Sequence, residues 1–75
     1  MLTRITADPR VCNGQPCVRG LRIPVSLVLQ HLAAGQTAEQ VVSEFPELEP
    51  EDIRECLTYA AWLASGRTIQ LPPAA

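Results

Sequence analysis

CNGQPCVRGLRIP, residues 12–24, is the stretch on which the fold of this 75-residue chain depends. Asn13-Gly14 is a strong signal for a tight turn, because both residues tolerate positive φ at low cost. Gly20 is a second conformationally permissive position. The residue before Pro24 must be extended, and proline itself is favoured at the start of a helix. We therefore expect Gly14, Gly20 and Pro24 to form a structural hinge that leads from a strand into a helix.

On the N-terminal side of this hinge, apolar and polar residues alternate. The alternation over residues 2–6 predicts a short half-buried strand, and Asp8-Pro9 is a turn signal that ends it. A second strand segment is expected over 18–23, so that residues 2–23 form a small antiparallel ribbon. A two-stranded ribbon is barely stable alone in water, so it must lie on the rest of the chain or join another sheet.

On the C-terminal side, apolar residues recur at helical spacing in three segments, which predict helices over about 24–34, 38–45 and 50–64. Thr37 and Gln40 have the spacing of a capping box at the start of the second helix. Pro50 is expected as the first residue of the third helix, with Glu49 in the cap position. The inward face of this helix is predicted to contain Ile53, Leu57, Ala60, Ala61 and Ala64.

Together these elements predict a mainly α fold. It is a three-helix homeodomain-like or winged-helix-like domain over residues 1–66 with a short N-terminal β-ribbon, followed by a C-terminal tail over 67–75. The segment LAAGQTAEQVVSEF, residues 32–45, resembles the start of the helix-turn-helix unit of resolvases. A chain this small buries only roughly 60% of its unfolded surface, which favours a homodimer or another bound partner.

The net charge of −2 is unevenly distributed along the chain. Residues 1–35 carry four arginines and one aspartate, which sum to +3. Residues 36–75 carry two arginines and seven carboxylates, which sum to −5. A basic half and an acidic half suit head-to-tail self-association or two different partners. A solvated helix surface with scattered arginines explains the same pattern equally well.

Four arginines are the candidate contacts to nucleic acid or to a partner protein: Arg4, Arg19, Arg22 and Arg54. DNA affinity comes mostly from cations that meet phosphates. The exposed start of the expected third helix carries carboxylates instead, and these would repel a duplex. These are Glu49, Glu51, Asp52 and Glu55. The ribbon is therefore the better surface for DNA. An alternative gives Arg19 and Arg22 a structural role, in ion pairs with Asp8 or Asp52.

The sequence offers little for catalysis or metal binding. There is one histidine and no recognisable Ser-His-Asp set, phosphate-binding glycine loop or carboxylate pair in an evident cleft, so we do not expect an enzyme. Cys12, Cys17 and Cys56 reach four zinc ligands only with His31, at a spacing that matches no tight motif. We expect no metal and no cofactor.

Three cysteines also argue against a disulfide framework. Cys12 and Cys17 could pair across the turn, but small half-buried thiols are the favoured interpretation for a cytosolic chain. The apolar runs are far too short to cross a bilayer, and the first twenty residues contain no signal-peptide core. A cytoplasmic location without membrane contact is expected.

Several strings together resemble a known bacterial and archaeal family, family 433 of the domains of unknown function. They are ITADP at 5–9, GQPCVRGLRIPV at 14–25, AG at 34–35, FPEL at 45–48, DI at 52–53 and YA at 59–60. The second string is long and specific. The family often has threonine in place of Leu21 and serine or threonine in place of Glu49.

The resemblance implies a homeodomain-like helical fold with a short N-terminal ribbon. It also implies a role as the antitoxin half, of the VapB type, in a toxin–antitoxin pair that is often encoded beside a PIN-like nuclease. We therefore predict a dimeric interaction module that binds a PIN-like toxin and its own operator DNA. The alternative is a stand-alone DNA-binding transcriptional regulator of the helix-turn-helix type.

Overall fold

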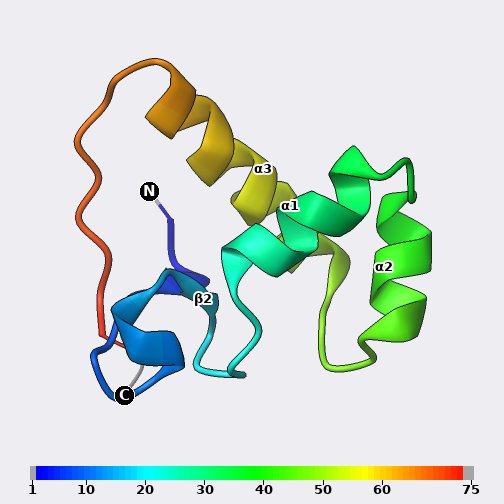
Figure 1. Ribbon diagram of the computed structural model, residues 1–75, viewed down its shortest axis with the longest axis horizontal. Helices are drawn as coiled ribbons and strands as arrows, with labels where there is room; N and C mark the ends of the chain where they lie inside the picture. Colours follow the sequence, from blue (N-terminus) through cyan, green and yellow to red (C-terminus); the bar gives the residue numbers. More distant parts are fainter. Residues whose placement is uncertain (1, 74–75) are drawn as a thin grey trace.

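A computed structural model describes residues 2–73, so residues 1, 74 and 75 of the predicted domain and tail lie outside the described residues. Its elements are β1 (Ile5–Thr6), β2 (Cys17–Val18), α1 (Val25–Ala33), α2 (Ala38–Glu44) and α3 (Pro50–Ala64), with a 3₁₀ turn at Cys12–Gly14. The mainly α prediction with a short N-terminal ribbon is confirmed. In Figure 1 the ribbon lies at one side of the molecule and α2 at the other.

The ribbon is shorter than the sequence predicts. β1 pairs antiparallel with β2, and Ile5 lies opposite Val18. Ahead of β1, the N–H groups of Thr3 and Arg4 do not join the ladder, because they donate to the Glu55 carboxylate at 3.0 and 2.8 Å. Strands over 2–6 and 18–23 were therefore too long as predictions. Glu55 takes the N–H groups ahead of β1, and the backbone becomes left-handed directly after β2.

The hinge has the predicted left-handed backbone at Gly14 (φ 82°) and Gly20 (φ 76°). Arg19 (φ 48°) and Arg22 (φ 62°) are also left-handed, so the chain turns sharply directly after β2. Pro24 is extended, with ψ 144°, and α1 begins one residue later than predicted. Pro24 is therefore the last extended residue before the helix and not its first turn.

Local signals fix the starts of the other two helices. Thr37 Oγ1 accepts from the Gln40 N–H at 3.1 Å, and Gln40 Oε1 accepts from the Thr37 N–H at 2.7 Å, which confirms the capping box. α2 ends one residue earlier than predicted. α3 has the predicted bounds, and Pro50 occupies its first turn, where a missing N–H costs nothing.

The core lies where the three helices meet the ribbon, and α1 packs on both α2 and α3. Its buried residues are Ile5, Val18, Ile23, Val25, Val28, Val41, Leu48, Ile53 and Cys56. On α3 the buried face is Asp52, Ile53 and Cys56, whereas Leu57 is 50% exposed and Ala61 and Ala64 are exposed. The predicted inward face was therefore rotated, because Asp52 points into the protein.

The tail leaves α3 at Gly66 and runs back to the ribbon as an extended chain (Figure 1). The Ala7 N–H donates to the Pro72 carbonyl at 2.8 Å, and Leu71 packs against the core. The tail predicted over 67–75 contains no helix up to residue 73. Across residues 2–73, no helix has the length and apolar character that crossing a membrane requires.

Candidate interaction site

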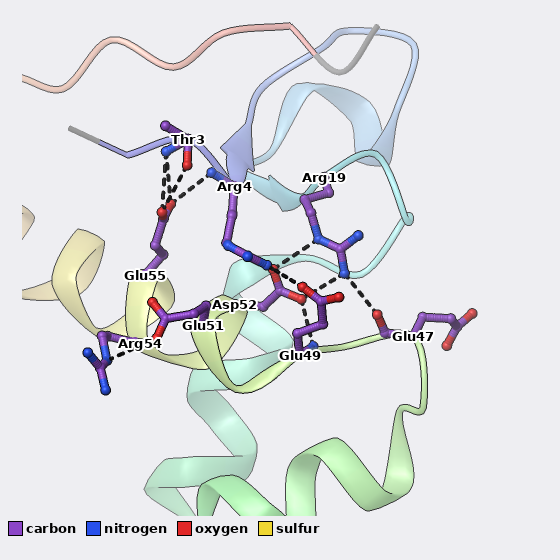
Figure 2. A network of polar contacts seen from close by, with 9 residues as sticks. All are labelled: Thr3, Arg4, Arg19, Glu47, Glu49, Glu51, Asp52, Arg54 and Glu55. Atoms are coloured by element: carbon purple, nitrogen blue, oxygen red, sulfur yellow. Dashed lines mark hydrogen bonds and ion pairs between the residues drawn. The ribbon is translucent and has the colours of Figure 1, made fainter.

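Asp52 is the centre of a network that joins the ribbon to α3. Its side chain is fully buried. Arg19 donates through Nε to Oδ1 at 3.0 Å and through Nη2 to Oδ2 at 2.8 Å, a bidentate pair. Arg4 Nη1 donates to Oδ1 at 3.1 Å, and the Glu49 N–H donates to Oδ2 at 2.7 Å. Figure 2 shows both guanidinium groups converging on this carboxylate from the ribbon side.

The network extends to both sides of Asp52. Arg19 Nη2 also donates to the carbonyl of Glu47 at 2.8 Å, in the connection between α2 and α3. Arg4 Nη1 lies 2.6 Å from Glu49 Oε1. Each arginine therefore bridges Asp52 to a second group in the segment that leads into α3. The arrangement holds β1, the hinge and the start of α3 at fixed positions relative to one another.

Burial and hydrogen bonding act in opposite directions on the pKa of Asp52. Burial alone would raise this pKa, because it removes water from the charged form. The hydrogen bonds from Arg19, from the Glu49 N–H and from Arg4 outweigh burial and lower the pKa below its ordinary value. The hydrogen bond to Asp52 in turn raises the pKa of Arg19. Asp52 is therefore a charged residue at neutral pH.

The four candidate arginines occupy different environments. Arg4 and Arg19 meet at Asp52, with side chains 29% and 32% exposed. Arg22 is exposed, and its side chain has no hydrogen bond or ion pair within residues 2–73. Arg54 is 76% exposed and lies 3.7 Å from Glu51, one turn away on α3. Arg19 thus has the ion pair that the structural alternative predicts, whereas Arg22 has none.

The carboxylates at the start of α3 are less available than the sequence suggests. Asp52 was expected on the exposed start of the helix, and that expectation was wrong. Glu49 is paired with Arg4, and Glu55 accepts the N–H groups of Thr3 and Arg4. Only Glu51 has no partner on the ribbon among the described contacts. The acidic repulsion predicted against a DNA duplex is therefore weaker at this helix than four free carboxylates would give.

Asp8 and Arg10 form a separate local pair. Arg10 Nη2 lies 2.9 Å from Asp8 Oδ2, and the Arg10 N–H donates to Asp8 Oδ1 at 2.9 Å. Asp8 is buried, and its pair with Arg10 raises the pKa of Arg10. Asp8 therefore binds Arg10, its neighbour in sequence, in the turn after β1.

An apolar groove of about 290 Å³ lies between α1 and α3. Its lining comes from the hinge loop and both helices: Gln15, Pro16, Val25, Ser26, Leu29, Tyr59 and Leu63. Leu63 is 50% exposed, as is Leu57, which does not line the groove. Leu63 is therefore the large apolar side chain that lines the groove and is half exposed to water.

His31 connects the end of α1 to α2. Its Nδ1 lies 2.6 Å from Gln36 Oε1 and 3.3 Å from Glu44 Oε2. Its ring packs edge-on against the Phe45 ring, with the two ring centroids 5.3 Å apart. These contacts hold the histidine ring in a half-buried position. No group of three His, Cys, Asp or Glu side chains among residues 2–73 is arranged to hold a metal ion.

Comparison with known proteins gives a family match and a curated relative. A family model described as a protein of unknown function, DUF433, matches residues 5–60. An uncharacterized protein y4eO of Sinorhizobium fredii (strain NBRC 101917 / NGR234) is 39% identical over 56 residues, which cover 75% of this chain and 25% of that protein. The chain therefore corresponds to about a quarter of its curated relative. No solved structure gives a significant match.

Proposed function

Because the chain belongs to the DUF433 family of proteins of unknown function, whose model covers residues 5–60, we propose that it acts as an antitoxin-like interaction module. It binds a PIN-like nuclease toxin as the non-catalytic half of a toxin–antitoxin pair. The proposal places the protein in the cytoplasm. The chain aligns with one part of a longer relative, which supports its proposed role as a module.

The observation that carries this proposal is the apolar groove between α1 and α3, with Leu63 half exposed at its rim. Apolar side chains at the centre of an interface provide most of its binding energy once water is excluded. A protein partner that inserts an apolar side chain between Leu29 and Tyr59 would bury this surface. Nucleic acid presents charged phosphates to a protein, and these do not bind in an apolar groove.

Charge supports a nuclease as the partner. Outside the Asp52 network, α2 and its flanks carry the exposed carboxylates Glu39, Glu44 and Glu47. A nuclease needs a basic surface to hold its nucleic acid, and an acidic partner is attracted to that surface. The proposed complex thus combines an apolar anchor in the groove with long-range attraction from the acidic side of the helices.

Co-purification with the product of a neighbouring PIN-like gene tests the proposal. Leu63→Glu places a charge in the groove and should weaken binding at least tenfold. Leu57→Glu is a matched control, because this leucine has the same exposure on the same helix but lies outside the groove. Absence of a complex with the wild-type chain, or equal losses in the two variants, would contradict the groove as the toxin-binding site.

The second candidate function is a DNA-binding regulator, alone or as a homodimer that also contacts its operator. Arg22 favours it, since this exposed arginine has no ion pair within residues 2–73 and is held in a left-handed conformation by the hinge. Functional residues often occupy such unfavourable backbone regions. A dimer would present Arg22 twice and double its phosphate contacts.

Gel-shift titrations with the promoter region test DNA binding. Salt-dependent binding that is lost in Arg22→Ala and kept in Arg54→Ala would assign contact to the hinge. The opposite pattern would assign contact to α3. No shift at low salt would remove the regulator hypothesis, and a monomeric mass from light scattering would remove the homodimer.

A further inference from the structure

Two cysteines stand at the ends of the loop that joins the halves of the ribbon. β1 and its continuation are paired at two places: Thr6 lies opposite Cys17, and Asp8 lies opposite Val11, the residue before Cys12. The chain therefore leaves this edge after Val11 and returns to it at Cys17. Both ends of the loop over residues 12–17 therefore lie beside the segment 6–8, and this brings Cys12 back toward Cys17.

The loop reaches this shape through three consecutive left-handed residues. Cys12 (φ 52°), Asn13 (φ 56°) and Gly14 (φ 82°) fold the chain back, and the Gln15 N–H donates to the Cys12 carbonyl at 3.0 Å. A left-handed conformation at a residue with a Cβ is unfavourable, so it persists only where the surroundings impose it. Burial and a hydrogen bond with the Cys12 thiol raise the pKa of Cys17 to about 12.

We propose that Cys12 and Cys17 form a reversible intramolecular disulfide when the protein meets a peroxide, so that the hinge loop is an oxidation site. The Cys12 thiolate attacks one peroxide oxygen and becomes a sulfenic acid, with release of water or an alcohol. The Cys17 sulfur then attacks the Cys12 sulfur, and the hydroxyl group leaves as water with the proton from the Cys17 thiol. Two thiols are oxidised, and one peroxide is reduced by the same two electrons.

The three thiols differ in access, which assigns their roles. Cys12 is half-buried and is the thiol that a peroxide reaches. Cys17 is 1% exposed and lies on the same ribbon edge to which Val11 returns the chain at Cys12, so it reacts in the second step. Cys56 is fully buried in the helical core, out of reach of a peroxide, so it stays reduced.

The disulfide would also affect the start of α1. The Pro16 carbonyl, directly before Cys17, accepts the Val25 N–H at 2.9 Å, and Pro16 lines the apolar groove. A bond between Cys12 and Cys17 therefore stiffens one wall of that groove. This coupling to toxin binding rests on the proposed function, whereas the disulfide itself does not.

The test treats the reduced full chain with a small excess of hydrogen peroxide. The remaining thiols are then alkylated under denaturing conditions and counted by mass spectrometry. We expect one alkylated thiol where the reduced chain has three, loss of the mass of two hydrogens, a cross-linked peptide containing residues 12–17, and full reversal by dithiothreitol. This readout needs no toxin, so its failure is distinct from failure of the proposed function.

Variants assign the two sulfurs. Cys56→Ala should still form the bond, whereas Cys12→Ser should keep its two remaining thiols reduced. Cys12 is only partly buried, so Cys12→Ser should fold, and circular dichroism checks this. The test therefore does not depend on whether Cys17→Ala, a change at a buried residue, folds. Cys12 sulfinic acid as the main product, a dimer linked through Cys12, or three thiols unchanged by peroxide would each overturn the proposal.

Discussion

Arg19 and Asp52, 33 positions apart in the sequence, are joined by two parallel hydrogen bonds of 3.0 and 2.8 Å. The pair spans the hinge and the first turn of α3 (Figure 2). A fully buried carboxylate is costly unless it is paired, and Asp52 has Arg4 as a second cation. The arginine expected to meet DNA or a partner therefore holds the ribbon against the helices.

Asp52→Asn tests the structural weight of this network. The change leaves the shape of the side chain but removes the charge that Arg4 and Arg19 share. We expect the free energy of unfolding to fall by about 2–3 kcal/mol, less than for a wholly buried pair because both guanidinium groups reach water. Urea denaturation measures the loss. Glu51→Gln, on the same helical turn but exposed, should change stability by no more than about 0.5 kcal/mol.

The lowered pKa of Asp52 gives stability a defined pH dependence. In the unfolded chain, Asp52 has the ordinary pKa of 3.8. In the folded chain its pKa is lower, so the carboxylate takes up a proton only at a lower pH. The stabilisation from Asp52 is therefore present above that value and is lost as pH falls through the folded pKa. In urea titrations between pH 7 and pH 2, the difference between wild type and Asp52→Asn should stay constant to about pH 4 and then shrink. A difference that grows on acidification would contradict this assignment.

Arg22→Gly should separate function from stability at the hinge. Arg22 has φ 62° and an exposed side chain, so glycine relieves the left-handed strain at this position. We expect stability to stay the same or rise by up to about 1 kcal/mol, because the relief exceeds the entropy that glycine adds to the unfolded chain. Thermal denaturation measures this change. A clear loss of stability would mean that the Arg22 side chain supports the fold.

Leu71→Ala should loosen the tail. Leu71 is half-buried against the core, and the next residue accepts the Ala7 N–H. We expect a loss of about 1 kcal/mol, below the value for a fully buried leucine. The Ala7 amide should also exchange its hydrogen faster, which NMR measures residue by residue. The exposed neighbour change Gln70→Ala should leave that exchange rate unchanged.

The helices could be predicted to within one residue because their ends depend on neighbours in sequence. Thr37 with Gln40 and Pro50 are signals of this local kind, and each acts as expected. The length of the ribbon could not be predicted in this way. The N–H groups of Thr3 and Arg4 bind Glu55, some fifty positions along the chain, and no local pattern records such a partner.

The candidate site was predictable in part. The sequence named Asp52 as one partner for the hinge arginines, yet its charge also placed it on the exposed start of α3, and the inward face of the helix was rotated as a result. An aspartate three residues after the cap position, where it accepts the Glu49 N–H, was the local signal for its true orientation. The groove between α1 and α3 depends on three-dimensional packing and had no sequence signal.

Backbone amides on either side of β1 are bound by other parts of the chain. Glu55 occupies the amides of Thr3 and Arg4, and the carbonyl of Pro72 occupies the amide of Ala7. An unprotected strand edge is a template on which foreign chains stack into filaments. Because these three donors are already satisfied from within, the chain on either side of β1 offers fewer free amides for a foreign strand to pair with.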